Sequence, residues 1–306
     1  MTRALYPSSQ GAALSAEPYR IDILSRVAAV VERTTGIFIA DRSYGKLGAA
    51  LSKIVTGSPQ QWVLEYEQQT ERHPAHASLI EQLTVHETYF YRDERQLEFF
   101  RTKLLPDLLR KKLTEGASTF RLWSAACSTG EEAYTLAIIA SEALTQLSRE
   151  PAFIMSAARL KIEVLATDLS RAVLAKAQEG VYRSEGMGSF RGVPKFLLDY
   201  FSITARSQNG RSFEELTPLA AIKRMVSFRQ FNLTSPMPPQ RGFDVVFCRN
   251  VLIYMQDDVR LRVFQMLERA LDADGYLLFG PTDSLKGAEL FHLHQNDGQS
   301  YYTRKA

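Results

Sequence analysis

The sequence predicts an α/β fold, with a doubly wound and mostly parallel sheet that follows an all-helical domain. Two observations support this prediction. Apolar residues recur three and four apart from about residue 19 to residue 112, with no strand signal between them. From residue 119 onward, short strand-like runs alternate with helix-like runs, which is typical of a parallel sheet covered by helices on both faces.

Length and composition narrow the class of protein. A chain of 306 residues suits two domains, and 45% hydrophobic with 23% charged residues is typical of a globular protein. A net charge of +3 is too small to indicate the basic face of a nucleic-acid-binding protein, so we expect no nucleic-acid partner. No apolar run reaches the roughly 20 residues that span a bilayer. The two cysteines are far apart in sequence, and we expect a cytoplasmic protein without disulfides.

The predicted helical domain covers residues 1–90, and a helical linker covers 91–118. The stretches "IDILSRVAAVVERTTG" and "DRSYGKLGAALSKIVTG" each end at a glycine, which is a common residue after a helix C-terminus. Ser58 and Pro59 are the expected N-cap and first residue of a third helix. Four aromatic residues near the linker are expected in the core: Phe90, Tyr91, Phe99 and Phe100.

The predicted α/β domain covers residues 119–306. Its expected strands are "TFRLWSAA", "KIEVLATD", "MVSFRQFN", "FDVVFCRN" and "GYLLFGPT", with a terminal "QSYYTRK". The alternation breaks between about residues 181 and 225, a stretch too long and too aromatic for a simple connection. We expect an inserted subdomain there, β-rich around "RSFEELTPL".

The first strand–helix junction, "SAACSTGEEAY", predicts a cofactor site. Ligands of open parallel sheets bind outside the carboxyl ends of the strands, and a dinucleotide site needs a glycine-rich loop. Here small residues such as Ala126 permit close approach, but Glu131 and Glu132 stand at the helix N-terminus. Carboxylates suit the helix dipole and repel a pyrophosphate. The cofactor should therefore lack phosphate and carry positive charge, and S-adenosylmethionine meets both conditions.

Asp168 ends the second predicted strand and allows two interpretations. An acidic residue at this position accepts hydrogen bonds from the ribose hydroxyls of a bound nucleoside. Aspartate is equally common as the N-cap of a following helix. The residue types alone leave both possibilities open.

Six segments resemble the bacterial chemotaxis receptor methyltransferase family, CheR, whose members are protein-glutamate O-methyltransferases. The segments are "TVHETYFYRDERQLEFF", "LWSAACSTGEEAYTLAI", "EVLATDLSRAVLAKAQEGVY", "FNLTSP", "FDVVFCRNVLIYM" and "GYLLFGPTDSL". The resemblance implies a Rossmann-like S-adenosylmethionine-dependent methyltransferase domain with a small inserted β-subdomain and an N-terminal all-helical domain. It also implies that the partners are methyl-accepting chemoreceptor cytoplasmic domains in chemotaxis signal transduction. S-adenosylhomocysteine is then the product, and we expect a monomer without membrane insertion.

Residue roles follow from the same segments. The expected catalytic residues are Arg92 and Tyr254. "GPTDSL" departs from the family's usual His-Ser-Glu after the glycine, so Asp283 receives no role, and His86 stands where family members often have asparagine. No metal site is expected. The expected cofactor contacts are His86, Thr88, Arg92, Ala126, Glu131, Glu132, Asp168, Asn232, Leu233, Arg249 and Asn250.

The expected chemistry needs no general base, because a glutamate is already ionised at pH 7. Arg92 is predicted to clamp the carboxylate of the cofactor, and Tyr254 to orient the carboxylate of the substrate. Two other functions stay open. One is a non-catalytic S-adenosylmethionine-binding regulatory module on the same fold, and the other is a methyltransferase for nucleic acid or a small molecule.

Overall fold

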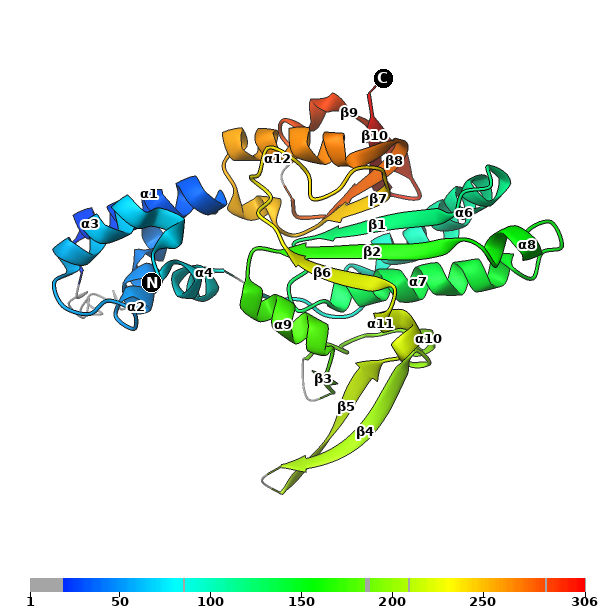
Figure 1. Ribbon diagram of the computed structural model, residues 1–306, viewed down its shortest axis with the longest axis horizontal. Coiled ribbons are helices and arrows are strands. Elements are labelled where there is room, and N and C mark those ends of the chain that lie inside the picture. The colour runs from blue at the N-terminus through cyan, green and yellow to red at the C-terminus, as the bar shows by residue number, and fades with distance from the viewer. Residues whose placement is uncertain (1–18, 85, 185–187, 209, 284, 306) are drawn as a thin grey trace, which may run out of the picture. The chain divides into compact units, whose positions relative to one another are not determined.

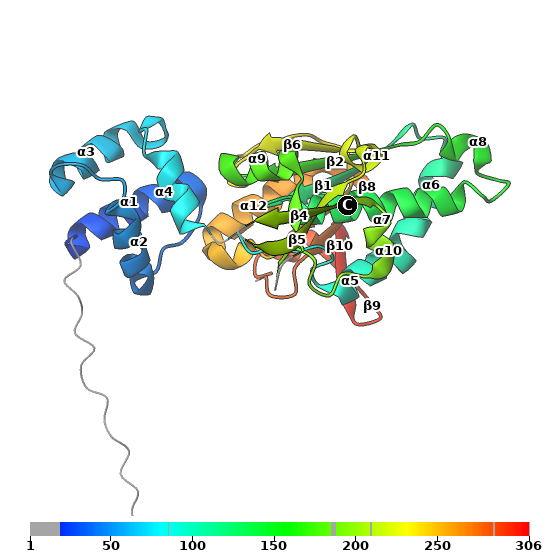
Figure 2. The ribbon, with the colours of Figure 1, turned by 90° about the horizontal axis from the view of Figure 1, so that it is seen from below.

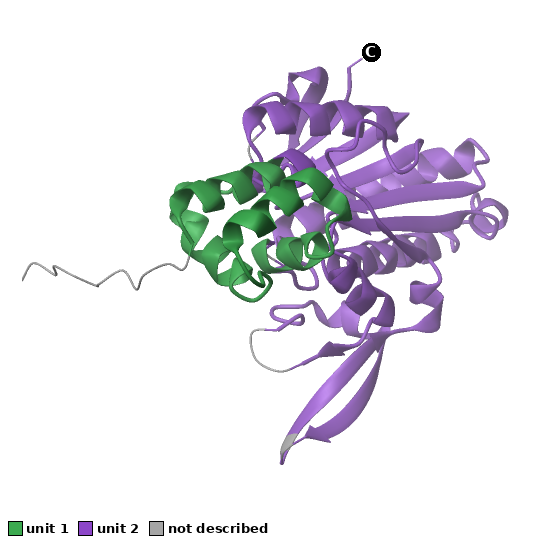
Figure 3. Ribbon diagram, turned by 60° about the vertical axis from the view of Figure 1, so that its left-hand side comes forward, with its two compact units in different colours: residues 1–32, 39–83 green, residues 33–38, 84–306 purple. Residues whose placement is uncertain are grey.

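The computed structural model describes residues 19–84, 86–184, 188–208, 210–283 and 285–305. The chain divides into two compact units (Figure 3). Unit 1 comprises residues 1–32 and 39–83, and unit 2 comprises residues 33–38 and 84–306. Within the described ranges, the helices are too short or too polar to cross a bilayer.

Unit 1 is helical, as predicted (Figure 2). Pro59 opens α3 after the N-cap Ser58, although the Ser58 side chain makes no capping hydrogen bond. The helices bury Leu24, Leu47 and Tyr66, and the Tyr66 hydroxyl lies 2.7 Å from Nδ1 of His76. The elements are α1 (Ile21–Thr35), whose last three residues fall in unit 2, η1 (Asp41–Ser43), α2 (Tyr44–Leu51), α3 (Pro59–Gln69), η2 (Thr70–Arg72) and α4 (His76–Leu83).

The segment from residue 84 to residue 118 belongs to unit 2, so the chain divides at residue 83 and not at residue 90. Leucines of its helices share one core with the sheet, which explains why it is no separate linker. Phe90, Tyr91, Phe99 and Phe100 are buried in that core, which confirms the prediction for these aromatics. The helices are α5 (Glu94–Phe99), the π-helical turn η3 (Phe100–Leu104) and α6 (Leu105–Thr114).

Unit 2 is built on a seven-stranded sheet of order β6-β2-β1-β7-β8-β10-β9 (Figure 1). The first five strands in this order pair in parallel, whereas β10 and β9 add an antiparallel hairpin at one edge. β2 and β7 flank β1, so the strand order reverses there, and doubly wound sheets bind their ligands at such a point, outside the carboxyl ends of the strands. The strands are β1 (Thr119–Ala125), β2 (Lys161–Asp168), β6 (Val226–Gln230), β7 (Phe243–Cys248), β8 (Leu271–Phe279), β9 (Phe291–Asn296) and β10 (Gln299–Arg304).

Alternate side chains of the strands pack on opposite faces of the sheet, as the period of two requires. Leu122 of β1 joins the core beneath α6 and α7 (Glu131–Leu147), whereas Trp123 joins the core beneath α12 (Asp257–Ala270). Figure 1 shows α7 and α12 on different sides of the sheet. The helices α8 (Ile154–Ala157) and α9 (Arg171–Glu179) pack on the same face as α7, because Ala157 and Leu174 belong to the core of Leu122.

The inserted subdomain is β-rich, as predicted. Its three antiparallel strands have the order β3-β5-β4, and β5 contains the predicted "RSFEELTP" (Figure 1). Phe201 at the start of β4 and Tyr182 of β3 join the ring of Phe90 in the core of unit 2. The elements are β3 (Tyr182–Arg183), α10 (Lys195–Leu198), β4 (Phe201–Gln208), β5 (Arg211–Pro218) and α11 (Ala220–Lys223).

Candidate functional site

Strained backbone gathers at the carboxyl edge of the sheet. Residues with positive φ pay a conformational cost unless they are glycine, and such strain concentrates at functional sites. The described part of the chain has seven such non-glycine residues, and five of them lie in the loops after β1 and β7 or in the segment before α5. The five are Tyr91, Asp93, Ala126, Ser128 and Asn250.

The loop between β1 and α7 turns sharply and is built from small side chains. Ala126 and Ser128 have φ of 67° and 49°, and Gly130 has φ of 94°. A Cβ atom on Gly130 would lie 2.8 Å from the Cβ of Ala177 in α9, so only glycine fits there. The turn brings the first residues of α7 to the end of β1.

Glu132 lies at the centre of the site. One carboxylate oxygen accepts a hydrogen bond from the hydroxyl of Ser124 at 2.6 Å. The other accepts from Nη1 of Arg249 at 2.9 Å. This side chain therefore ties β1, α7 and the end of β7 together.

Arg249 is buried, with 1% of its side chain exposed. Its Nη2 donates to the carbonyl of Arg92 at 2.6 Å and to Oδ2 of Asp93 at 2.8 Å. Its Nε is buried without a hydrogen-bond partner in the part of the chain described. The guanidinium thus pairs with the carboxylates of Glu132 and Asp93, and its Nε–H remains available as a donor.

Glu131 turns away from this group although it stands beside Glu132 in sequence. Its carboxylate accepts hydrogen bonds from Thr129 and Ser189, each at 2.7 Å, and the residue is 2% exposed. Burial raises the pKa of Glu131, although the two hydroxyls oppose that rise. Adjacent residues of a helix point about 100° apart, and here the two carboxylates meet different partners. The structure brings Glu132, and not Glu131, to the predicted site residue Arg249.

Asp168 braces the β1 loop. Its Oδ2 accepts from the backbone N–H of Ser128 at 2.9 Å, and its Oδ1 accepts from the N–H of Ser170 at 3.0 Å. The N-cap of α9 is Ser170, whose hydroxyl accepts from the N–H of Val173. The N-cap interpretation of Asp168 is therefore wrong. Its half-buried carboxylate lies at the carboxyl end of β2, beside the loop.

Asn232 and Leu233 follow β6. The amide of Asn232 donates to the carbonyl of Thr34 at 2.6 Å and accepts from the backbone N–H of Thr234 at 3.0 Å. Its polar atoms are thus already engaged within unit 2. Leu233 is buried in the same core as Trp123.

The segment before α5 reaches the β1 loop through its backbone. The carbonyl of His86 accepts from the Ser128 hydroxyl at 3.3 Å, while the His86 ring lies 2.7 Å from Oγ1 of Thr84. Thr88 is half-buried. The half-buried Arg92 donates to the carbonyl of Glu87 at 2.5 Å.

The inserted subdomain holds the same segment from its other side. Ser189 accepts from the N–H of Phe90 at 2.8 Å through its backbone carbonyl. Arg191 donates to Glu87 at 2.6 Å and lies 3.9 Å from the ring centre of Tyr89. Arg191 also lowers the pKa of Glu87.

The loop after β7 carries Asn250, with φ of 57°, and leads into the short helix η4 (Leu252–Tyr254). Tyr254 is half-buried. Burial raises the pKa of its hydroxyl, and the positive charge of Arg92 opposes the rise.

Asp283 organises this loop, and the sequence analysis gave it no role. Its Oδ2 accepts from the N–H groups of Asn250 and Gly280 at 2.6 and 2.9 Å. Its Oδ1 accepts from the N–H of Leu252 at 2.9 Å. The residue is 8% exposed, and burial raises its pKa. The sequence did offer a signal for this role: Asp283 is an acidic residue that closely follows a buried strand, at the edge of the sheet where ligands bind.

These residues fit S-adenosylmethionine, the cofactor that the resemblance implies. The small β1 loop permits close approach, and the half-buried carboxylate of Asp168 lies where a ribose would be bound. The buried Nε of Arg249 lacks an acceptor in the described chain. Clusters of three or more His, Cys, Asp or Glu that could hold a metal are absent from those described residues.

Comparison with known proteins places the chain among methyltransferases. A family model described as "CheR methyltransferase, SAM binding domain" matches residues 86–299. A chemotaxis protein methyltransferase of Borreliella burgdorferi is 30% identical over 87% of this chain and 89% of its own length. Chemotaxis protein methyltransferase 1 of Pseudomonas aeruginosa is 31% identical over 83% of this chain and 87% of its own length.

Proposed function

Because the chain belongs to the CheR methyltransferase family, we propose that it methylates glutamate side chains of chemoreceptor cytoplasmic domains. S-adenosylmethionine is the methyl donor, and the product is a glutamyl methyl ester that serves adaptation in chemotaxis. Because these receptor domains lie in the cytoplasm, we propose that the enzyme is cytoplasmic. We further propose that it acts as a monomer.

One observation carries this proposal: the buried Arg249 joins Glu132 and Asp93 at the carboxyl edge of β1 and β7. The predicted site residues come from segments far apart in sequence, and this ion-pair network unites three of those segments. Asp168 adds a half-buried carboxylate beside the same loop. Ligands of doubly wound sheets bind at this position.

We assign the following contacts. Asp168 accepts from the ribose, and Glu132 and Arg249 lie along the methionyl part beside Ala126. Leu233 packs on the adenine, while Asn232 contributes through its backbone, because its amide is engaged with Thr34. The further cofactor contacts that we propose are His86, Thr88, Arg92 and Asn250.

The transfer depends on positioning. When bound, S-adenosylmethionine supplies the methyl group of its sulfonium. The acceptor glutamate is ionised at pH 7, so the protein needs no general base. Arg92 holds the cofactor carboxylate through its planar guanidinium, and Tyr254 donates a hydrogen bond that orients the acceptor carboxylate. Such orientation contributes up to roughly 7–11 kcal/mol to lowering a barrier.

The decisive experiment incubates the chain with methyl-labelled S-adenosylmethionine and receptor cytoplasmic fragments. We expect label in base-labile esters, and Glu→Gln changes at the acceptor positions should abolish it. Binding of S-adenosylhomocysteine without any labelling would indicate a non-catalytic binding module instead. Label on nucleic acid or on a small molecule would contradict the proposed substrate.

A further inference from the structure

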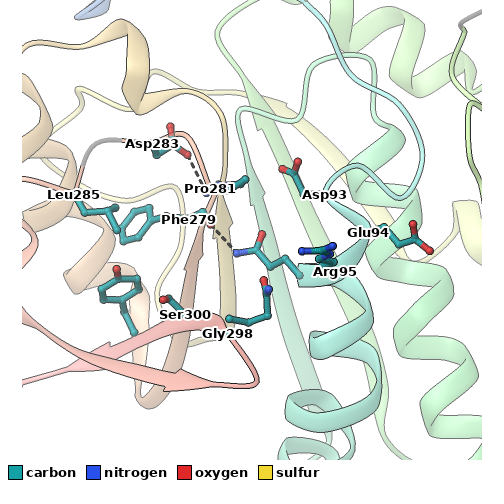
Figure 4. A pocket seen from close by; sticks show the side chains of 13 residues that line it. Asp93, Glu94, Arg95, Phe279, Pro281, Asp283, Leu285, Gly298 and Ser300 are labelled. Atoms are coloured by element: carbon teal, nitrogen blue, oxygen red, sulfur yellow. Dashed lines mark hydrogen bonds between the residues drawn. The ribbon is translucent and has the colours of Figure 1, made fainter.

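A cavity of about 490 Å³ lies at the carboxyl end of β8 (Figure 4). It is framed by the residues that open α5, by the loop after β8 and by the turn of the β9–β10 hairpin, all within unit 2. None of the cofactor contacts assigned above lines it. Its volume is in the usual range for small-molecule sites.

An unsatisfied acceptor lies in the wall of this cavity. Gln96 is 7% exposed, and its Nε2 donates to the carbonyl of Phe279 at 2.7 Å. That hydrogen bond identifies the nitrogen of the amide, so the other atom is the oxygen, Oε1. This Oε1 is buried and has no hydrogen-bond partner among the described residues. A buried acceptor without a donor costs about 1–3 kcal/mol.

The charges of the lining favour a cation. Three carboxylates, those of Asp93, Glu94 and Asp283, line the cavity against one guanidinium, that of the exposed Arg95. Figure 4 shows Asp93 and Asp283 on either side of Pro281, whereas Glu94 points away from them. Asp93 gives one oxygen to Arg249, and the carboxylate of Asp283 receives only backbone N–H groups. Their field therefore attracts an ammonium or guanidinium group.

The rest of the wall suits an aliphatic chain. Phe279 and Tyr302 meet edge to face with ring centres 5.2 Å apart, and Pro281 and Leu285 complete the apolar part. Lysine and arginine carry a charged head on an apolar stem, which matches this division.

We propose that this cavity binds a lysine or arginine side chain of the polypeptide that carries the acceptor glutamate. Asp93 connects the two sites, since it lines the cavity and pairs with Arg249 of the cofactor network. The enzyme then favours substrates with a lysine or arginine near the acceptor glutamate. It disfavours substrates that would place an acidic side chain in this cavity. The identity of the occupant rests on the proposed function, whereas cation binding does not.

The test titrates the full chain calorimetrically with Nα-acetyl-lysine amide and with its uncharged isostere, Nα-acetyl-norleucine amide. No methyl donor is present, so the result is independent of methyl transfer. We expect the lysine probe to bind at least about tenfold more tightly, because a hydrogen bond to a charged donor contributes about 1.5–3 kcal/mol. Equal affinity of the two probes, or no binding of the lysine probe, would overturn the proposal.

Two variants locate the binding. Ser300→Phe fills the cavity from β10 without removing a described hydrogen bond, and it should weaken the lysine probe at least about tenfold. The control is His292→Phe, an exposed position of β9 that pairs with Thr303 and so lies on the other face of the hairpin. It should leave the affinity unchanged. Unchanged affinity in Ser300→Phe would place any binding elsewhere and refute the site.

If the probe binds but receptor fragments are not methylated, the cavity stands and the proposed function fails. With receptor fragments as substrate, Ser300→Phe should raise KM and leave kcat nearly unchanged, because neither Arg92 nor Tyr254 lines the cavity. A lower kcat at unchanged KM would contradict a role in substrate binding.

Discussion

The guanidinium of Arg249, with 1% of its side chain exposed, lies 2.9 Å from the carboxylate of Glu132 on the first turn of α7. Sequence separates the two residues by 117 positions. Their pairing joins the loop that follows β1 to the loop that follows β7. The network extends from there to Asp93, so this pair determines where three segments of the site meet.

Removal of one partner of this pair should cost stability as well as function. Glu132→Ala leaves Arg249 with one carboxylate, and loss of a buried ion-pair partner typically costs about 3–5 kcal/mol. We expect a fall of that order in the free energy of unfolding, measured with urea. The double variant Glu132→Ala with Arg249→Met should be less stable than Glu132→Ala alone, because Asp93 then loses its partner as well. A double variant that is more stable would contradict this account.

Variants of Asp168 and Ser170 should distinguish a role in ligand binding from a role in capping α9. Asp168→Asn should weaken S-adenosylhomocysteine about tenfold in calorimetric titration, because an amide replaces one of the acceptor oxygens. Ser170→Ala removes the N-cap of α9 and should cost about 1 kcal/mol of stability with little change in affinity. The reverse pattern would mean that Asp168 serves the fold alone.

Arg92→Ala should lower kcat for receptor methylation by about a hundredfold, the scale of a misplaced reactant. The side chain is half-buried and donates to one backbone carbonyl, so the free energy of unfolding should change little. Arg92→Lys should not restore the rate, because an ammonium cannot replace a planar, two-pronged donor. Rates like those of the wild type in Arg92→Ala would remove this residue from the mechanism.

Asp283 should act as a positioning residue for the Asn250–Tyr254 loop. Asp283→Asn puts an amide N–H₂ against backbone N–H groups, so the left-handed Asn250 loses its anchor. We expect kcat to fall by roughly a hundredfold, and Asp283→Glu should recover part of the rate. An equal loss in both variants, accompanied by unfolding at room temperature, would indicate a purely structural role.

Glu131 should make stability depend on pH. Its pKa is raised in the folded state by burial, so the folded protein holds this proton more tightly than the unfolded chain does. Its contribution is therefore fully present below the unfolded pKa of about 4.3 and is lost as pH rises through the folded value. Glu131→Gln keeps a neutral side chain at every pH. The stability of the wild type relative to this variant, from urea unfolding, should fall as pH rises above about 4.3. A constant difference would contradict the assignment.

The sequence predicted the architecture of the sheet because strands and helices leave local periodic signals. It located the β1 loop, Asp168 and the inserted β-rich segment for the same reason. It missed β9, where His292, His294 and Gln295 obscure the alternation of apolar residues. β10 pairs with β9 along its whole length, a long-range contact that no local pattern reveals.

The division of labour between Glu131 and Glu132 could not be predicted from composition. Both stand in the first turn of α7, and only the helical phase decides which one meets Arg249. The role of Asp283 likewise depends on the sheet, which brings the ends of β7 and β8 side by side. Such roles arise from tertiary contacts and become visible only in three dimensions.

The insertion contacts the site through two of its residues. Ser189 binds Glu131 and the backbone of Phe90, and Arg191 binds Glu87. The insertion therefore helps to hold the site in place. Shortening the insertion to a turn would remove Ser189, which donates a hydrogen bond to the buried carboxylate of Glu131, the neighbour of Glu132. An exchange of this insertion between homologues therefore requires that residues 189–191 be left in place.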